Sequence, residues 1–102
     1  MLTTVDGLRY GQLVKSIAGR DQNQYYLIFG LVGEKYLLLV DGQYHRVSKP
    51  KKKNIKHVQA RMLVDKVIEE QLVRSEAVTD SNIMTAIRRM KNELEEGDRF
   101  HG

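Results

Sequence analysis

The sequence predicts a mainly β fold with an α-helical appendage: a small barrel of five short strands, followed by a C-terminal antiparallel helical hairpin. Two observations support this prediction. In residues 8–60, short apolar runs rich in aromatic and branched residues alternate with turn-forming residues, as closely spaced strands require. From residue 60 onwards, apolar residues recur at the three-and-four spacing of a helix face. We therefore assign residues 1–60 to the barrel, 61–98 to the helical hairpin and 99–102 to a frayed tail.

Five strands are expected in the first part of the chain. The first three are predicted at residues 12–17, 25–32 and 35–40. Asp41-Gly42 is a strong hairpin signal, because a type I′ turn needs positive φ at both central residues, and it predicts a fourth strand at 43–47. A closing strand is expected at 55–58. Because five short strands follow one another so closely, we expect a strongly bent barrel that leaves no open edge.

The chain then changes to a helical period. One apolar helix face contains Ala60, Leu63, Val64, Val67, Ile68 and Leu72, and a second contains Ile83, Ala86, Ile87, Met90 and Leu94. Thr79 or Asp80 can cap the second helix through a side-chain oxygen, and Gly97 is placed to end it. The link at residues 74–78 is short, which favours antiparallel packing of the two helices.

Composition indicates one folded domain with an appendage. The chain has 102 residues, 41% of them hydrophobic and 29% charged, which is ordinary for a globular protein. There is no cysteine, so no disulfide framework or thiolate metal site is expected, as suits a reducing compartment. The amino terminus lacks the pattern of a signal peptide, and no apolar run is long enough to span a bilayer. We expect a cytoplasmic protein that does not bind membranes.

Positive charge is concentrated in the first part of the chain. Residues 1–60 hold 10 Lys and Arg against 4 Asp and Glu, whereas residues 61–102 hold 7 against 9, so balances of +6 and −2 give the net charge of +4. The segment 42–64 contains no acid, and five lysines fall within residues 49–56 around the single proline. Such a cluster suits a polyanion, because each neutralised phosphate releases counterions. A solvated basic loop that only aids solubility is the plain alternative.

Residues 11–21, Gly-Gln-Leu-Val-Lys-Ser-Ile-Ala-Gly-Arg-Asp, resemble a KOW motif, which joins a first strand to a glycine-containing turn beside a basic residue. The Asp41-Gly42 turn and the proline–lysine loop extend the likeness over residues 8–60. The sequence is similar to large-subunit ribosomal proteins of eukaryotic and archaeal type with an SH3-like barrel, and to small bacterial RNA-binding proteins that resemble them. One departure is Gln22-Asn23-Gln24 where many KOW motifs have a second glycine, and Asn23 can substitute because asparagine tolerates left-handed backbone geometry.

This resemblance implies an SH3-like KOW barrel that binds RNA, with ribosomal RNA as the expected target. Gly19 would allow close approach of the backbone, and Arg20 offers a planar fork of donors to a phosphate. A plain hairpin turn with an exposed arginine is the alternative for these two residues. The expected contacts with RNA are Lys15, Gly19, Arg20, Arg46, Lys49, Lys51, Lys52, Lys53, Lys56 and His57.

Two of the aromatic residues are candidates for stacking on unpaired bases. They are Tyr25 and Tyr44, each close in sequence to a basic loop. Phe29 and other strand aromatics are predicted to belong to the core or scaffold. His45 and His57 have no nearby acid or cysteine to complete a metal shell, so phosphate contact or packing is expected of them instead.

No catalytic residue, metal site or cofactor is expected, because the sequence has no nucleophile elbow, phosphate-cradling glycine loop or paired catalytic acids. Two other binding functions stay open. The acidic helical hairpin can dock a protein partner while the barrel serves as a scaffold, alone or in combination with RNA binding by the barrel. Duplex DNA is the third option, although no element is an evident groove reader.

Overall fold

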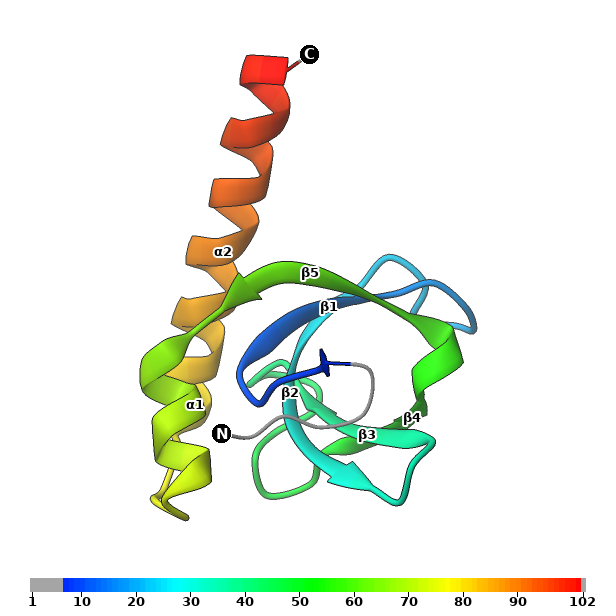
Figure 1. The fold of residues 1–102 in the computed structure, drawn as a ribbon, viewed down its shortest axis with the longest axis vertical. Helices are drawn as coiled ribbons and strands as arrows, with labels where there is room; N and C mark the ends of the chain where they lie inside the picture. The colour runs from blue at the N-terminus through cyan, green and yellow to red at the C-terminus, as the bar shows by residue number, and fades with distance from the viewer. Residues whose placement is uncertain (1–6, 102) are drawn as a thin grey trace.

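The computed structural model describes residues 7–101, and the side chains of residues 7–95. Five strands form one antiparallel sheet and two helices follow it (Figure 1), which confirms the predicted order of elements. A short 3-10 helix, η2, separates the last two strands. The bounds are β1 (Gln12–Ser16), β2 (Tyr25–Val32), β3 (Tyr36–Val40), β4 (Lys51–Asn54), η2 (Ile55–His57), β5 (Val58–Val64), α1 (Lys66–Val73) and α2 (Asp80–His101).

The sheet has the order β4-β3-β2-β1-β5, so the last strand returns to pair with the first. β4 and β5 are the two edges, and the expectation of a closed barrel without edges is therefore wrong. The chain between these edges turns through η2, because the side chain of Asn54 accepts a hydrogen bond from the Lys56 N–H and caps the 3-10 turn. The edge strand β4 is rich in lysine, which discourages pairing with another chain.

The sheet is buried on both faces. On one face, Leu13, Leu27 and Val40 pack with the helices in a cluster that includes Ile83 and Met90. On the other face, a second cluster forms from the neighbouring strand positions, with members Leu8, Val14, Tyr26, Ile28, Leu37 and Leu39. Neighbouring residues of β1, β2 and β3 thus enter different cores. This explains why β2 and β3 are continuous apolar runs, as strands covered on both sides require.

The second helix begins as predicted, whereas the first begins later. Thr79 Oγ1 accepts a hydrogen bond from the Asn82 N–H at 3.1 Å, which confirms Thr79 as a cap. The first helix was expected from residue 60, but residues 58–64 form β5, and Val14 of β1 pairs with Ala60 there. Pairing with β1 therefore overrides the helical spacing of residues 60–64, and α1 starts after Asp65, whose carboxylate accepts from the Ile68 N–H at 3.0 Å.

The two helices lie side by side near their connection, where residues of both line one groove (Figure 1). Gly97 was expected to end the second helix, but α2 continues through it to His101. Residues 99–101 of the predicted tail are thus part of α2, and Gly102 lies outside the described residues, as do residues 1–6 of the predicted barrel. A glycine within a helix costs only about 1 kcal/mol relative to alanine, which the surrounding turns can offset.

Residues 41–50 form a loop rather than the fourth strand predicted at 43–47. Asp41 Oδ1 accepts hydrogen bonds from the N–H groups of Gln43 and His45, at 2.9 and 2.8 Å, and so folds the loop on itself. The Val47 N–H donates to Asp80 Oδ1 at 2.8 Å, which ties the loop to the start of α2. Because the loop is longer than a two-residue hairpin, the fourth strand begins only at Lys51, inside the lysine run.

Candidate nucleic-acid interface

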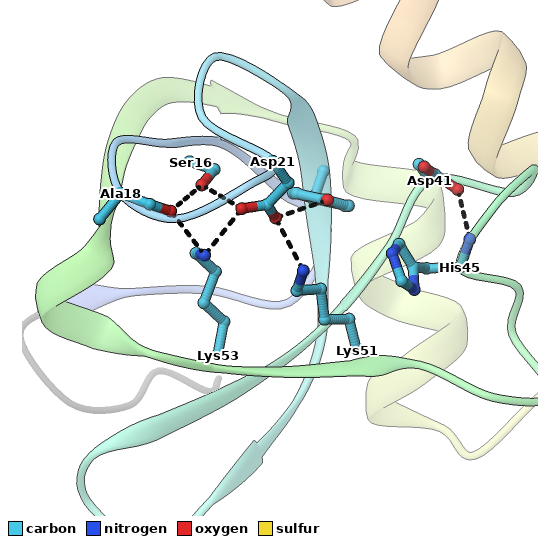
Figure 2. A network of polar contacts seen from close by, with 8 residues as sticks. Ser16, Ala18, Asp21, Asp41, His45, Lys51 and Lys53 are labelled. Atoms are coloured by element: carbon cyan, nitrogen blue, oxygen red, sulfur yellow. Dashed lines mark hydrogen bonds and ion pairs between the residues drawn. The ribbon is translucent and has the colours of Figure 1, made fainter.

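The turn after β1 lies against β4, so the two basic segments of the sequence are neighbours. Asp21, in this turn, contacts Lys53 Nζ at 2.9 Å and Lys51 Nζ at 3.1 Å (Figure 2). The Ile17 N–H donates to the His57 carbonyl at 2.9 Å. The motif turn at residues 17–24 and the lysine run therefore border one another.

Two left-handed residues give this turn its shape. Gly19 has φ +89° and Asn23 has φ +76°, which confirms the expectation that Asn23 can adopt the geometry of a glycine. The turn closes where the Asn23 N–H donates to the Ser16 carbonyl at 2.8 Å. A Cβ on Gly19 would lie 3.6 Å from Lys53 Nζ, an ordinary contact distance, so the left-handed backbone rather than lack of space favours glycine here.

Asp21 accepts from four side chains. Its Oδ1 accepts from Ser16 Oγ and Lys53 Nζ, both at 2.9 Å, and its Oδ2 accepts from Tyr26 OH at 2.7 Å and pairs with Lys51 Nζ. Lys53 Nζ also donates to the Ala18 carbonyl at 3.0 Å (Figure 2). Sequence reasoning missed Asp21 as an organising residue, although it is the only acid in residues 7–33.

These contacts stabilise the ionised form of Asp21. Burial acts to raise the pKa of this carboxyl, but the hydrogen bonds from Lys53, Tyr26, Ser16 and Lys51 outweigh it and hold the pKa well below its usual range. Burial and the hydrogen bond to Asp21 raise the pKa of Tyr26 above its usual value. At neutral pH Asp21 is therefore a carboxylate and Tyr26 a neutral phenol.

Strand alternation divides the lysine run. Lys51 and Lys53 point to the Asp21 side of β4, and Lys53 is only 8% exposed. Lys52 points the opposite way and is exposed, with its Nζ 4.6 Å from the centroid of the Tyr36 ring. Of the three central lysines predicted to contact RNA, Lys53 and Lys51 thus both pair with the partly buried carboxylate of Asp21. The third, Lys52, is free for a phosphate.

Five exposed cations lie on the segments that border this cluster, on both sides of β4, and we call them together the basic edge. No acid among the described residues forms an ion pair with any of them. Its members come from the turn after β1, from the 41–50 loop, from β4 and from η2: Arg20, Arg46, Lys49, Lys52 and Lys56. His57 is exposed beside them. The side chain of Arg46 makes a long contact of 3.4 Å from Nε to the Gln43 carbonyl, which leaves the end of its guanidinium available.

The two candidate stacking residues occupy different environments. Tyr25 is half-buried and packs against the core, and two lysines approach its ring: Lys91 Nζ at 5.3 Å and Lys15 Nζ at 5.9 Å from the centroid. Lys15 lies at this ring and not on the basic edge. Tyr44 is 80% exposed and lies on the 41–50 loop. Tyr44 is therefore the tyrosine with a ring free to stack.

Both tyrosines line a groove of about 330 Å³ between α2 and the loops at residues 24 and 41–44, which we call the α2 groove. Two helix cations, Arg88 and Lys91, line it as well, together with Gln24, Asp41, Gln43, Met84, Ile87, Asn92 and Glu95. Sequence reasoning assigned no role to the helix cations. Their three-residue spacing, which puts both on one helix face, is the signal that could have identified them.

In comparisons with protein-family models and with curated proteins, none matches the chain. Among the described side chains, those of residues 7–95, no group of three His, Cys, Asp or Glu is arranged to hold a metal ion. The helices of this part of the chain include none with the length and hydropathy to cross a bilayer. The fold and the arrangement of charge are therefore the basis for assigning a function.

Proposed function

We propose that the protein binds RNA through the basic edge, in a binding role without catalysis. The observation that supports this most is the state of its cations. Arg20, Arg46, Lys49, Lys52 and Lys56 are exposed, come from four separate elements, and form no ion pair with a described acid. The fold satisfies Asp21 with the two other lysines of the run. The exposed cations are thus in excess of what the described structure uses, as phosphate binding requires.

Ribosomal RNA is the target we propose, on the strength of the KOW resemblance. A five-stranded antiparallel sheet whose last strand returns to the first is the arrangement expected of a bent SH3-like barrel, and the left-handed Gly19 follows β1 where the motif has its glycine. Contacts to phosphates fix the position of a protein on nucleic acid and read little sequence. We therefore expect recognition of RNA shape, with structured RNA preferred to duplex DNA.

A salt titration tests this proposal. If the five cations of the basic edge each neutralise one phosphate, a plot of log binding constant against log salt concentration has a slope of about −3.5 to −4.5. The measurement uses the whole protein and labelled ribosomal RNA fragments, with duplex DNA as competitor. A slope near zero would contradict the proposal and direct attention to a protein partner of the helices. Displacement by duplex DNA as readily as by RNA would favour a DNA-binding role.

Two matched double variants locate the contact. Changing Lys49 and Lys52 to Gln removes two charges from the basic edge, and we expect the slope to flatten by about 1.4–1.8. Changing Lys66 and Arg74 to Gln removes the same charge from α1 and its C-cap, where both residues are exposed, and we expect no change in slope. Equal effects of the two variants would mean that net charge, rather than this surface, determines binding.

A further inference from the structure

The α2 groove combines features that suit a single nucleotide. An exposed aromatic ring, Tyr44, stands at one side, and the helix cations Arg88 and Lys91 line the other. Its volume of about 330 Å³ falls within the range of about 300–1,000 Å³ typical of small-molecule sites. The side-chain amides of Gln24, Gln43 and Asn92 are also in the lining, where they can hydrogen-bond to the edge of a base.

Two cations that line the groove are available to an anionic group. Arg88 and Lys91 form no ion pair with a described acid. Two acids share the lining, Asp41 and Glu95, and Asp41 Oδ1 accepts from two backbone N–H groups of its own loop. Arg61 lies with Lys91 in an adjoining hollow of about 120 Å³. With Arg61 included, three cations stand against two carboxylates, which leaves a balance of +1.

The α2 groove is also connected to the basic edge. Tyr44 lines the groove and, in addition, a hollow formed within the 43–51 segment, where Arg46 and Lys49 are among the lining residues. Tyr44 is therefore within reach of an RNA strand that Arg46 and Lys49 hold. A base that is not paired can turn onto the ring, whereas a paired base stays in its helix.

We propose that the α2 groove holds one unpaired nucleotide of the bound RNA, with its base stacked on Tyr44 and an adjacent phosphate held by Arg88 and Lys91. This inference rests on the proposed RNA-binding function and narrows the substrate to RNA with a bulged or looped-out nucleotide. Tyr25 is the scaffold of the site, because its ring supports Lys91. Stacking of a base on an aromatic side chain is worth about 1–3 kcal/mol, or about 5- to 150-fold in affinity.

Two RNA hairpins that differ only by a single bulged adenosine provide the test. We expect the wild-type protein to bind the bulged hairpin about 5- to 150-fold more tightly than the paired one. The change Tyr44→Ala should remove this preference, and Tyr44→Phe should retain it because the ring remains. A fluorescent adenine analogue at the bulge should report stacking in the wild type and in Tyr44→Phe only. Since Tyr44 is 80% exposed, neither change should impair folding, which circular dichroism checks.

The helix cations are tested in the same assay. The change Arg88→Gln should weaken binding of the bulged hairpin more than binding of the paired one, whereas Arg74→Gln, an exposed arginine beyond α1, should alter neither. Equal affinity for the two hairpins, or an equal loss on both with Tyr44→Ala, would overturn the nucleotide site while the steep salt dependence of the basic edge still stands. Failure to bind either hairpin in a salt-dependent manner would overturn the RNA-binding function as well.

Discussion

Replacement of Asp21 by Asn is the most direct test of the polar cluster formed by Asp21, Ser16, Tyr26, Lys51 and Lys53. The carboxylate accepts from four side chains, two through each oxygen. An asparagine keeps one acceptor oxygen, which we expect to face Lys53 and Ser16, because the Lys53 side chain is only 9% exposed and cannot turn to water. Lys51, at 29%, can do so. The amide then meets Tyr26, whose hydroxyl can accept from it.

The cost follows from the change in each contact. Hydrogen bonds to a charged group are worth about 1.5–3 kcal/mol, against about 0.5–1.5 for neutral pairs, so the contacts of Lys53, Ser16 and Tyr26 each lose roughly 1 kcal/mol. The half-exposed pair with Lys51 adds about 0–1 kcal/mol. We expect the free energy of unfolding to fall by about 3 kcal/mol, and the melting temperature by about 12–24 °C for a domain of this size.

Equilibrium unfolding in urea, followed by circular dichroism, measures this change. The double variant Asp21→Asn with Lys53→Met separates the Asp21–Lys53 pair from the other contacts of Asp21. Methionine fills the space of the lysine stem but places no cation there. We expect its free energy of unfolding to exceed the additive value by about 1–3 kcal/mol. The control Glu34→Gln removes an exposed acid in the β2–β3 turn and should stay within about 0.5 kcal/mol of wild type. A loss below about 0.5 kcal/mol in Asp21→Asn, or strict additivity, would refute this reasoning.

Three further predictions follow from single contacts. Folding lowers the pKa of Asp21. The ionised carboxylate therefore stabilises the fold above the unfolded pKa of about 3.9, and this stabilisation is lost at lower pH. The difference in unfolding free energy between wild type and Asp21→Asn should shrink as pH falls from about 6 to 2. Gly42→Ala should destabilise by more than about 2 kcal/mol in urea unfolding, because φ is +82° and a Cβ would lie 2.5 Å from the Asp80 carbonyl and 2.7 Å from Met84 Cγ; a neutral effect would mean that the loop does not pack closely on α2. Thr79→Ala should cost about 1 kcal/mol through loss of the α2 cap, and Thr79→Ser should restore it if the hydroxyl is responsible.

The strands that were predicted well are those with a strong local signal. β2 has the predicted bounds, and β1 and β3 differ from theirs by one residue at one end. Both faces of β2 and β3 are buried, so the composition of these two strands is apolar nearly throughout and marks their ends clearly. The fourth strand was misplaced because its sequence, Lys-Lys-Lys-Asn, carries no apolar signal. Its extended conformation comes from pairing with β3, where Leu37 lies opposite Lys53.

The boundary between sheet and helices was misplaced for a related reason. Residues 60, 63 and 64 have the spacing of a helix face, and the same residues serve as an edge strand that pairs with β1. A three-residue match cannot distinguish the two conformations, because hydrophobic spacing is ambiguous in short segments. The polar residue Asp65 sets the boundary between β5 and α1, since its carboxylate caps α1 and also contacts Arg89 at 3.0 Å. Only the second of these contacts depends on residues distant in sequence.

The candidate site was predicted in its composition but not in its geometry. A run of lysines read as a loop offers every charge to solvent, whereas a strand sends alternate side chains to opposite faces. Lys51 and Lys53 therefore meet Asp21, and Lys52 alone of the three faces away. The capacity of such a run to bind phosphates depends on the number of its cations that lack an internal acid, and here the single carboxylate of Asp21 pairs with two of them. Substituting all three central lysines together would thus combine loss of stability with loss of the proposed RNA binding. Lys49 and Lys52 are the positions at which the two effects separate.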